Sequence, residues 1–96
     1  MDYVQKLARI VSEKIGNKGV YCIHDSTGKL IAGQGAGGNC LSPDKNGGWR
    51  VFIQELARAD IYEDYHLETE REACIKFIEI TEDKYHLSKY LSVFIS

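Results

Sequence analysis

Apolar residues recur every three or four positions over 2–19 (DYVQKLARIVSEKIGNKG), and charged residues occupy most positions between them. This spacing places the apolar side chains on one face of a helix. The stretch predicts a helix of about four turns that ends near Gly16 and Asn17, which tolerate a left-handed cap. The apolar face would consist of Tyr3 or Val4, Leu7, Ile10 or Val11, and Ile15.

Two β-hairpins are predicted downstream. The first joins 20–24 (VYCIH) to 29–33 (KLIAG) through DSTG, whose Asp, Ser and Gly suit a tight turn. The second joins 47–57 (GGWRVFIQELA) to 61–68 (IYEDYHLE) through a turn near 58–60, because both segments alternate with a period of two. In the last strand one face would carry Ile61, Glu63, Tyr65 and Leu67, and the other Tyr62, Asp64 and His66.

The C-terminal part predicts two helices. Thr69 is followed three residues later by Glu72, which is the capping-box spacing, and Ala73, Cys74, Phe77 and Ile78 form an inward stripe. A further helix would begin at Thr81, with a face made of Leu87, Tyr90 or Leu91, and Phe94. We therefore expect one α+β domain over 1–96: an antiparallel meander sheet of about four strands, with the N-terminal helix and both C-terminal helices packed on one face.

Composition restricts the location and the redox chemistry of the chain. No apolar run approaches the roughly 20 residues needed to cross a bilayer, and Met1-Asp2-Tyr3 leads directly into an amphipathic pattern. We expect a cytoplasmic protein that does not bind a membrane. Cys22, Cys40 and Cys74 are odd in number and widely spaced, so we expect reduced thiols, two of them buried, and no structural zinc.

A glycine-rich segment, Gly33-Gln34-Gly35-Ala36-Gly37-Gly38, matches the G-x-G-x-x-G pattern of dinucleotide-binding turns. Such a turn must lead into a helix whose amides hold the pyrophosphate, but Pro43, Asn46 and Gly47-Gly48 follow and the next expected element is a strand. We interpret 33–48 as a flexible loop between hairpins, of the kind that often serves function in a small domain. A small ligand-binding domain built on Gly33–Gly38 remains an alternative.

Other side chains do not form a convincing catalytic or metal site. Cys22 and His24 share a strand face, but a metal needs three or four ligands, and neither His66 nor His86 completes a set. Glu63 and Asp64 are adjacent in a strand, so their carboxylates would point to opposite faces and could not act on one substrate atom. We expect a protein without enzymatic activity, cofactor or metal.

Acidic residues are concentrated in one third of the chain. Segment 54–83 contains ten Asp or Glu against three Lys or Arg, a net charge of −7, whereas the whole chain carries −2. This charge disfavours nucleic acid, whose binding requires clustered basic residues, and it attracts basic proteins. Because aromatic residues lie among the acids and favour binding hot spots, we predict these partner-contact residues: Glu55, Asp60, Tyr62, Glu63, Asp64, Tyr65 and Glu68.

Two segments resemble small bacterial immunity proteins, which accompany polymorphic and contact-dependent growth-inhibition toxins. The first is the strand pattern W-x-V-F-x-x-E at Trp49, Val51, Phe52 and Glu55. The second is the acidic helix E-x-E-A-C-x-x-F at Glu70, Glu72, Ala73, Cys74 and Phe77. The resemblance implies a non-catalytic protein that binds one cognate toxin domain and blocks it.

Many such toxins are nucleases with basic surfaces, so an acidic inhibitor surface would imitate the charge of their substrate, and charge complementarity would speed encounter. Another small inhibitor, such as a phage-encoded antagonist of a nucleic-acid-binding enzyme, is the alternative within the binding class.

Overall fold

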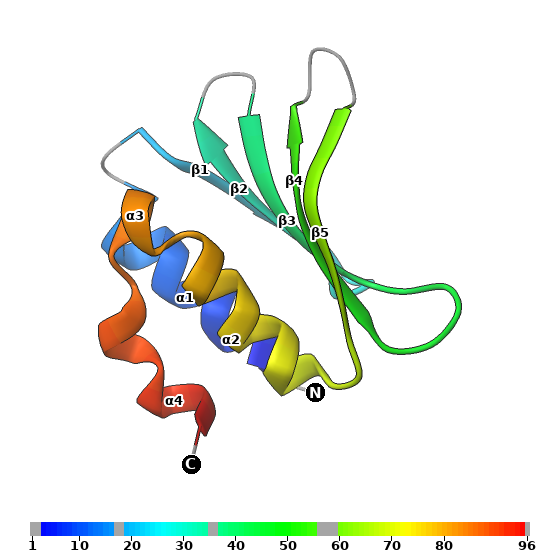
Figure 1. The fold of residues 1–96 in the computed structure, drawn as a ribbon. Helices are drawn as coiled ribbons and strands as arrows, with labels where there is room; N and C mark the ends of the chain where they lie inside the picture. Colours follow the sequence, from blue (N-terminus) through cyan, green and yellow to red (C-terminus); the bar gives the residue numbers. More distant parts are fainter. Residues whose placement is uncertain (1–2, 17–18, 35–36, 56–59, 96) are drawn as a thin grey trace.

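The computed structural model of the protein describes residues 3–16, 19–34, 37–55 and 60–95. Along the chain, one helix is followed by five strands, then by a second helix of similar length and three short helical segments (Figure 1). The elements are α1 (Tyr3–Lys14), β1 (Tyr21–His24), β2 (Leu30–Gln34), β3 (Gly37–Pro43), β4 (Trp49–Glu55), β5 (Asp60–Leu67), α2 (Glu70–Ile80), α3 (Glu82–Tyr85), the 3-10 turn η2 (Ser88–Tyr90) and α4 (Ser92–Ile95).

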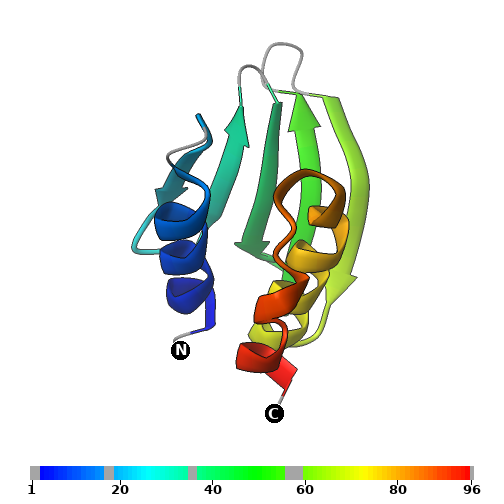
Figure 2. The same cartoon turned by 90° about the vertical axis from the view of Figure 1, so that its left-hand side faces the viewer.

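The five strands form one antiparallel sheet in the order β1-β2-β3-β4-β5, a meander in which each strand pairs with its neighbours in sequence. Helices α1 and α2 lie side by side against one face of this sheet (Figures 1 and 2). The predicted α+β meander with helices on one face is confirmed, but the sheet has five strands rather than about four.

The core lies between the helices and the covered face of the sheet. Directly paired residues on neighbouring strands point to the same face, and Leu30, Leu41 and Val51 form one such fully buried row across β2, β3 and β4. The helices contribute the opposite side of the core. Their buried residues are Val4, Leu7, Ala8 and Val11 from α1, Ala73, Cys74, Phe77 and Ile78 from α2, and Phe94 from α4.

Both long helices begin at the same end of the molecule (Figure 2). The predicted capping box is present, since Thr69 accepts from the amide of Glu72 and the Glu72 side chain accepts from the amide of Thr69. In addition, the carboxylate of Glu70 accepts a hydrogen bond from the amide of Val4 at 2.8 Å. One carboxylate therefore lies at the positive ends of both helix dipoles and joins α1 to α2.

Strand β3 was not predicted, and its seven residues lie in the middle of the expected flexible loop over 33–48. Its sequence, GGNCLSP, is rich in residues that strands disfavour. It is nevertheless the central strand, because β2 and β4 pair with it on either side. Its covered face includes the buried Asn39, whose amide group donates to the carbonyl of Ala32 at 3.2 Å and to the hydroxyl of Tyr85 at 3.1 Å.

The glycines of the G-x-G-x-x-G pattern lie in paired strands. Gly33 in β2 pairs with Gly38 in β3, and Gly35 lies outside the described residues. The hydroxyl of Tyr21 lies over this pair, near the positions that their Cβ atoms would occupy, and donates to the carbonyl of Gly37 at 3.5 Å. The glycines therefore allow close packing of backbone and ring, and strand β4, rather than a helix, is the next regular element.

A β-bulge in β5 overturns the predicted alternation of its side chains. Tyr65 pairs with Val51, but Tyr62 pairs with Ile53, so the two residues Glu63 and Asp64 stand opposite one residue of β4. Glu63 has a φ of 49°, in the left-handed region. Tyr62 and Tyr65 consequently share the face that the helices cover.

The segment after α2 is three short pieces rather than the predicted single helix. His86 adopts a left-handed conformation with a φ of 55° and ends α3. Thr81 does not cap α3 with its side chain; its hydroxyl donates back to the carbonyl of Phe77 at 2.7 Å. The expected apolar contacts are kept, because Leu87 and Phe94 are buried.

The glycine pair leads to a first prediction. A methyl group at Gly33 would collide with the carbonyl of Gly37, whereas nothing lies within 4 Å of a methyl group at Gly37. Gly33→Ala should lower the free energy of unfolding by about 1–3 kcal/mol, as overpacking does. Gly37→Ala is the matched control and should change it by about 0.5 kcal/mol or less. Urea denaturation measures both values, and equal effects would contradict the packing described for β2 and β3.

Candidate functional site

An acidic cluster occupies the end of the sheet where β4 finishes and β5 begins. Glu55 and Asp60 are directly opposed across the two strands, and Tyr62 shares their face. Like charges directly opposite one another destabilise a sheet. Asp60 and Glu55 also raise the pKa of the Tyr62 phenol, because negative charge disfavours the phenolate. We call Glu55, Asp60 and Tyr62 the acidic tip.

Exposed apolar surface accompanies the acidic tip. The Tyr62 side chain is 48% exposed, and the neighbouring Ile61 is 43% exposed. Ile61 pairs with Gln54 and so faces the side of the sheet opposite to Tyr62. Ile61 was not among the predicted contacts. Simple alternation placed it on the same face as Tyr65, and the bulge places it on the opposite face.

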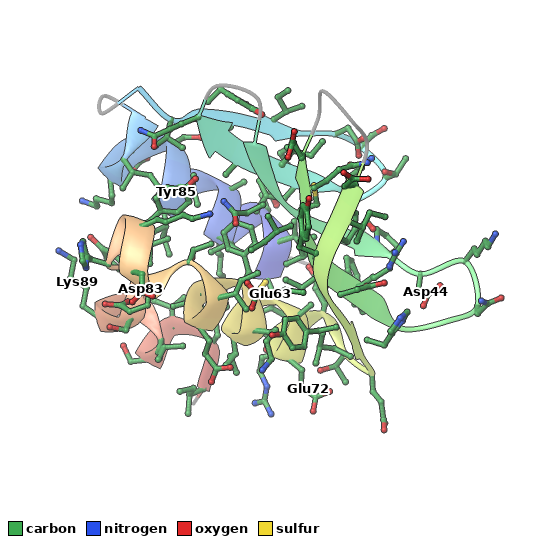
Figure 3. All side chains as sticks on the ribbon, turned by 45° about the horizontal axis from the view of Figure 1, so that its top comes forward. Asp44, Glu63, Glu72, Asp83, Tyr85 and Lys89 are labelled. Atoms are coloured by element: carbon green, nitrogen blue, oxygen red, sulfur yellow. The ribbon has the colours of Figure 1, made fainter. Side chains whose placement is uncertain are left out.

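Glu63 and Tyr65 lie next to α2 rather than at the tip. The hydroxyl of Tyr65 donates to the Glu63 carboxylate at 3.2 Å, and the ammonium group of Lys76 lies 4.8 Å from the centre of the Tyr65 ring. Figure 3 shows Glu63 projecting from β5 on the side of the helices. Glu63 therefore extends the acidic surface from the tip along the edge strand. The half-buried Tyr65 has one side of its ring covered by Lys76.

Asp64 belongs to the opposite face of the sheet. Its carboxylate accepts two hydrogen bonds from the guanidinium of Arg50, each 2.8 Å long, and these hold the pKa of Asp64 below its usual range. The guanidinium in turn lies 4.6 Å from the centre of the Phe52 ring. Asp64 thus orients a side chain that covers an aromatic residue, and it is separated from the acidic tip by the sheet.

The remaining acids of the segment have varied surroundings. Glu68 is exposed in the link between β5 and α2, at the other end of the strand from the acidic tip. Glu70 and Glu72 accept backbone hydrogen bonds at helix ends. Glu79 lies 3.2 Å from the ammonium of Lys76, and Glu82 accepts from the amide of Ser88. The acidic residues behind the net charge of −7 therefore fall into two groups, those with structural roles and those on the edge strand β5.

The cysteines and histidines do not assemble a reactive site. Cys40 and Cys74 are buried, as predicted for two of the three free thiols, and burial raises the pKa of Cys74 to about 12. Thiols with so high a pKa are poor nucleophiles. Cys22 does share a face with His24, and its thiol donates weakly to the carbonyl of Ala8 at 3.8 Å. Within the described residues, no three His, Cys, Asp or Glu side chains gather as a metal site.

An open hollow of about 380 Å³ lies at the other end of the molecule, between the start of α1, the β1–β2 turn and Trp49. Its carboxylates already bind backbone groups: Asp25 accepts from the amides of Thr27 and Lys29, and Glu70 from that of Val4. The hollow is thus lined by groups that hold the fold together.

Comparison with known proteins adds no further identification. A scan of protein-family models found no match to this chain, and searches of curated proteins and of solved structures found no similar protein. Among the described helices, none has both the length and the apolar composition that a membrane crossing requires. The resemblance to immunity proteins accordingly stays a prediction.

The electrostatics of the acidic tip can be measured directly. Asp60→Asn removes the largest cause of the raised Tyr62 pKa, so that pKa should fall toward the ordinary value of about 10. An NMR titration that follows the Tyr62 ring carbons measures the change. Asp83→Asn, on α3, is the control and should leave the Tyr62 pKa where it is. An unchanged Tyr62 pKa in Asp60→Asn would show that the tip has no concentrated negative potential.

Backbone strain at Glu63 leads to a stability prediction. A non-glycine residue in the left-handed region costs roughly 1–2 kcal/mol, so Glu63→Gly should raise the free energy of unfolding by about 1 kcal/mol. His86 has a similar φ, and His86→Gly should stabilise the protein comparably. Chemical denaturation of both variants tests this, and destabilisation by Glu63→Gly would mean that the bulge depends on the glutamate side chain.

Proposed function

We propose that this protein is an immunity protein that binds and neutralises a cognate toxin domain, most simply a basic nuclease, through the acidic tip and the adjoining strand β5. The observation that carries the proposal is the direct opposition of Glu55 and Asp60 beside the exposed Tyr62. Two carboxylates and an exposed phenol on one face of the sheet are thereby placed together at its end. A cationic partner surface would be attracted to this concentration of acidic side chains.

The combination of charge and exposed apolar surface fits a protein partner better than a small ligand. Tyr62 and Ile61 provide the aromatic and aliphatic surface that anchors protein interfaces, and they point to the two sides of one edge strand. A partner that grips the edge of the sheet would contact both. The carboxylates around them would speed encounter and disfavour acidic competitors.

Strain at Glu63 also supports a functional role for β5. Left-handed conformations of non-glycine residues persist at sites where the conformation serves a purpose, since a glycine would remove the strain. In this strand the bulge determines that Tyr62 points to the helix side of the sheet and Ile61 to the open side. The proposed neutralisation needs no catalysis: the acidic edge of this protein would cover the toxin's basic substrate-binding surface.

The proposal predicts a charge-dependent association rate. The partner to test is the C-terminal domain of the protein encoded directly upstream of this one. Asp60→Lys should slow association with that domain by about tenfold at low salt, because electrostatic steering contributes factors of ten or more. Asp83→Lys makes the same change of charge on α3, away from β5 (Figure 3), and should leave the rate unchanged. Stopped-flow fluorescence or biolayer interferometry measures both rates.

Equal association rates for Asp60→Lys and the wild type would place the contact surface elsewhere on the molecule. Failure of the wild-type protein to protect cells that express the upstream domain would reject the immunity function itself.

A further inference from the structure

The two edges of the sheet differ in their protection against pairing with another strand. The β5 edge contains the bulge and the exposed charged residues Asp60, Glu63 and Asp64. Bulges and charges on an edge strand are the usual means of preventing such pairing. Additional backbone pairing at β5 is therefore disfavoured.

The β1 edge has none of these features. Tyr21–His24 contains no Asp, Glu, Lys, Arg, Gly or Pro, and its register with β2 is unbroken over all four residues. Ile23 is 56% exposed on the face of the sheet that the helices leave open. The strand is short, which is the one remaining feature that opposes pairing with another strand. A short strand limits the strength of such pairing but does not prevent it.

The β1–β2 hairpin determines which backbone groups of β1 bond to β2 and which point away from the sheet. The amide of Asp25 donates to the carbonyl of Lys29 at 3.1 Å, so bonding alternates back along the strand from that pair. Ile23 and Tyr21 then bond to β2. The amide and carbonyl groups of Cys22 and His24 point away from the sheet, where another strand could bind them.

We propose that β1 is a homodimer interface, in which β1 strands of two copies pair antiparallel about a two-fold axis at Ile23. Cys22 then exchanges both backbone hydrogen bonds with His24 of the partner subunit, and His24 with the partner subunit's Cys22. The two Ile23 side chains meet in the closer, non-hydrogen-bonded type of pair, which buries the exposed isoleucine. The result is one continuous sheet across both subunits.

The residues of β1 favour a second copy of the same chain as the strand that pairs with it. The two-fold pairing places an apolar residue against its own copy and sets no like charges of the strand opposite each other. A register centred on Cys22 would need Val20, which lies outside β1 and is buried. Next to β1, the exposed residues of α1 that flank Ala8 by three and four positions are the uncharged Gln5 and Ser12, and the nearest charge on that side of the helix is Arg9.

The dimer is independent of the proposed immunity function. Because β1 and β5 are opposite edges of the sheet, pairing through β1 leaves both acidic tips free. Each dimer would present two identical tips at its far ends, and the oligomeric state can be measured without any toxin.

Sedimentation velocity of the wild-type protein tests the interface. We expect a monomer–dimer equilibrium within the micromolar to millimolar range. Ile23→Lys should abolish the dimer by placing two positive charges at the two-fold axis. Ile95→Lys is the matched control, since Ile95 is also 56% exposed but lies on α4, and it should dimerise like the wild type. A wild-type protein that is monomeric at millimolar concentration, or a folded Ile23→Lys variant that still dimerises, would overturn the proposal.

Amide hydrogen exchange of the wild-type protein tests the register without any substitution. Exchange at Cys22 and His24 should slow as concentration rises, while exchange at Ile23, which bonds to β2, should not depend on concentration. Concentration-dependent protection at Val20 and Cys22 instead of His24, or at β5, would reject the pairing about Ile23.

Discussion

A sheet that receives helices on one face only must shield its other face with its own side chains. Here the covered face is conventional, with Leu30, Leu41 and Val51 in a row beneath α1 and α2. On the open face, Phe52 and Cys40 are also buried although no described helix covers them. Arg50, held by Asp64, lies over the Phe52 ring and performs this shielding. Within the described part of the sheet, the exposed large apolar side chains are Ile23, Ile61 and Tyr62, which lie on the two edge strands. These edges are therefore the parts of the sheet where partners can be recognised.

The acidic character of the C-terminal half has two origins that a count of charges does not separate. Glu70 and Glu72 are acidic because helix N-termini attract carboxylates. Glu55 and Asp60 oppose each other across β4 and β5, at no helix terminus and beside the exposed Tyr62. The first pair is explained by helix capping. The position of the second pair, next to an exposed aromatic side chain, is the basis for the function proposed for the tip.

Sequence reasoning recovered the elements whose signals are local. The spacing of Leu7, Val11 and Ile15 and the capping box at Thr69 depend on near neighbours, and both helices formed as expected. Strand β3 was missed because its stability comes from two flanking strands and from the Asn39 contact with Tyr85, which lies far along the chain. The left-handed residues Glu63 and His86 were missed because neither is a glycine, so nothing in the local sequence marks the bulge or the break.

The bulge at Glu63 has a consequence for how such a molecule could change its specificity. One extra residue reverses the side of the sheet to which each side chain in the first part of β5 points. The second part of the strand keeps its place in the core. Deleting that residue would exchange the directions of Ile61 and Tyr62 and leave the row through Tyr65 intact. A single codon gained or lost could therefore give the tip a new chemical surface in one step, whereas point substitution would have to rebuild it residue by residue.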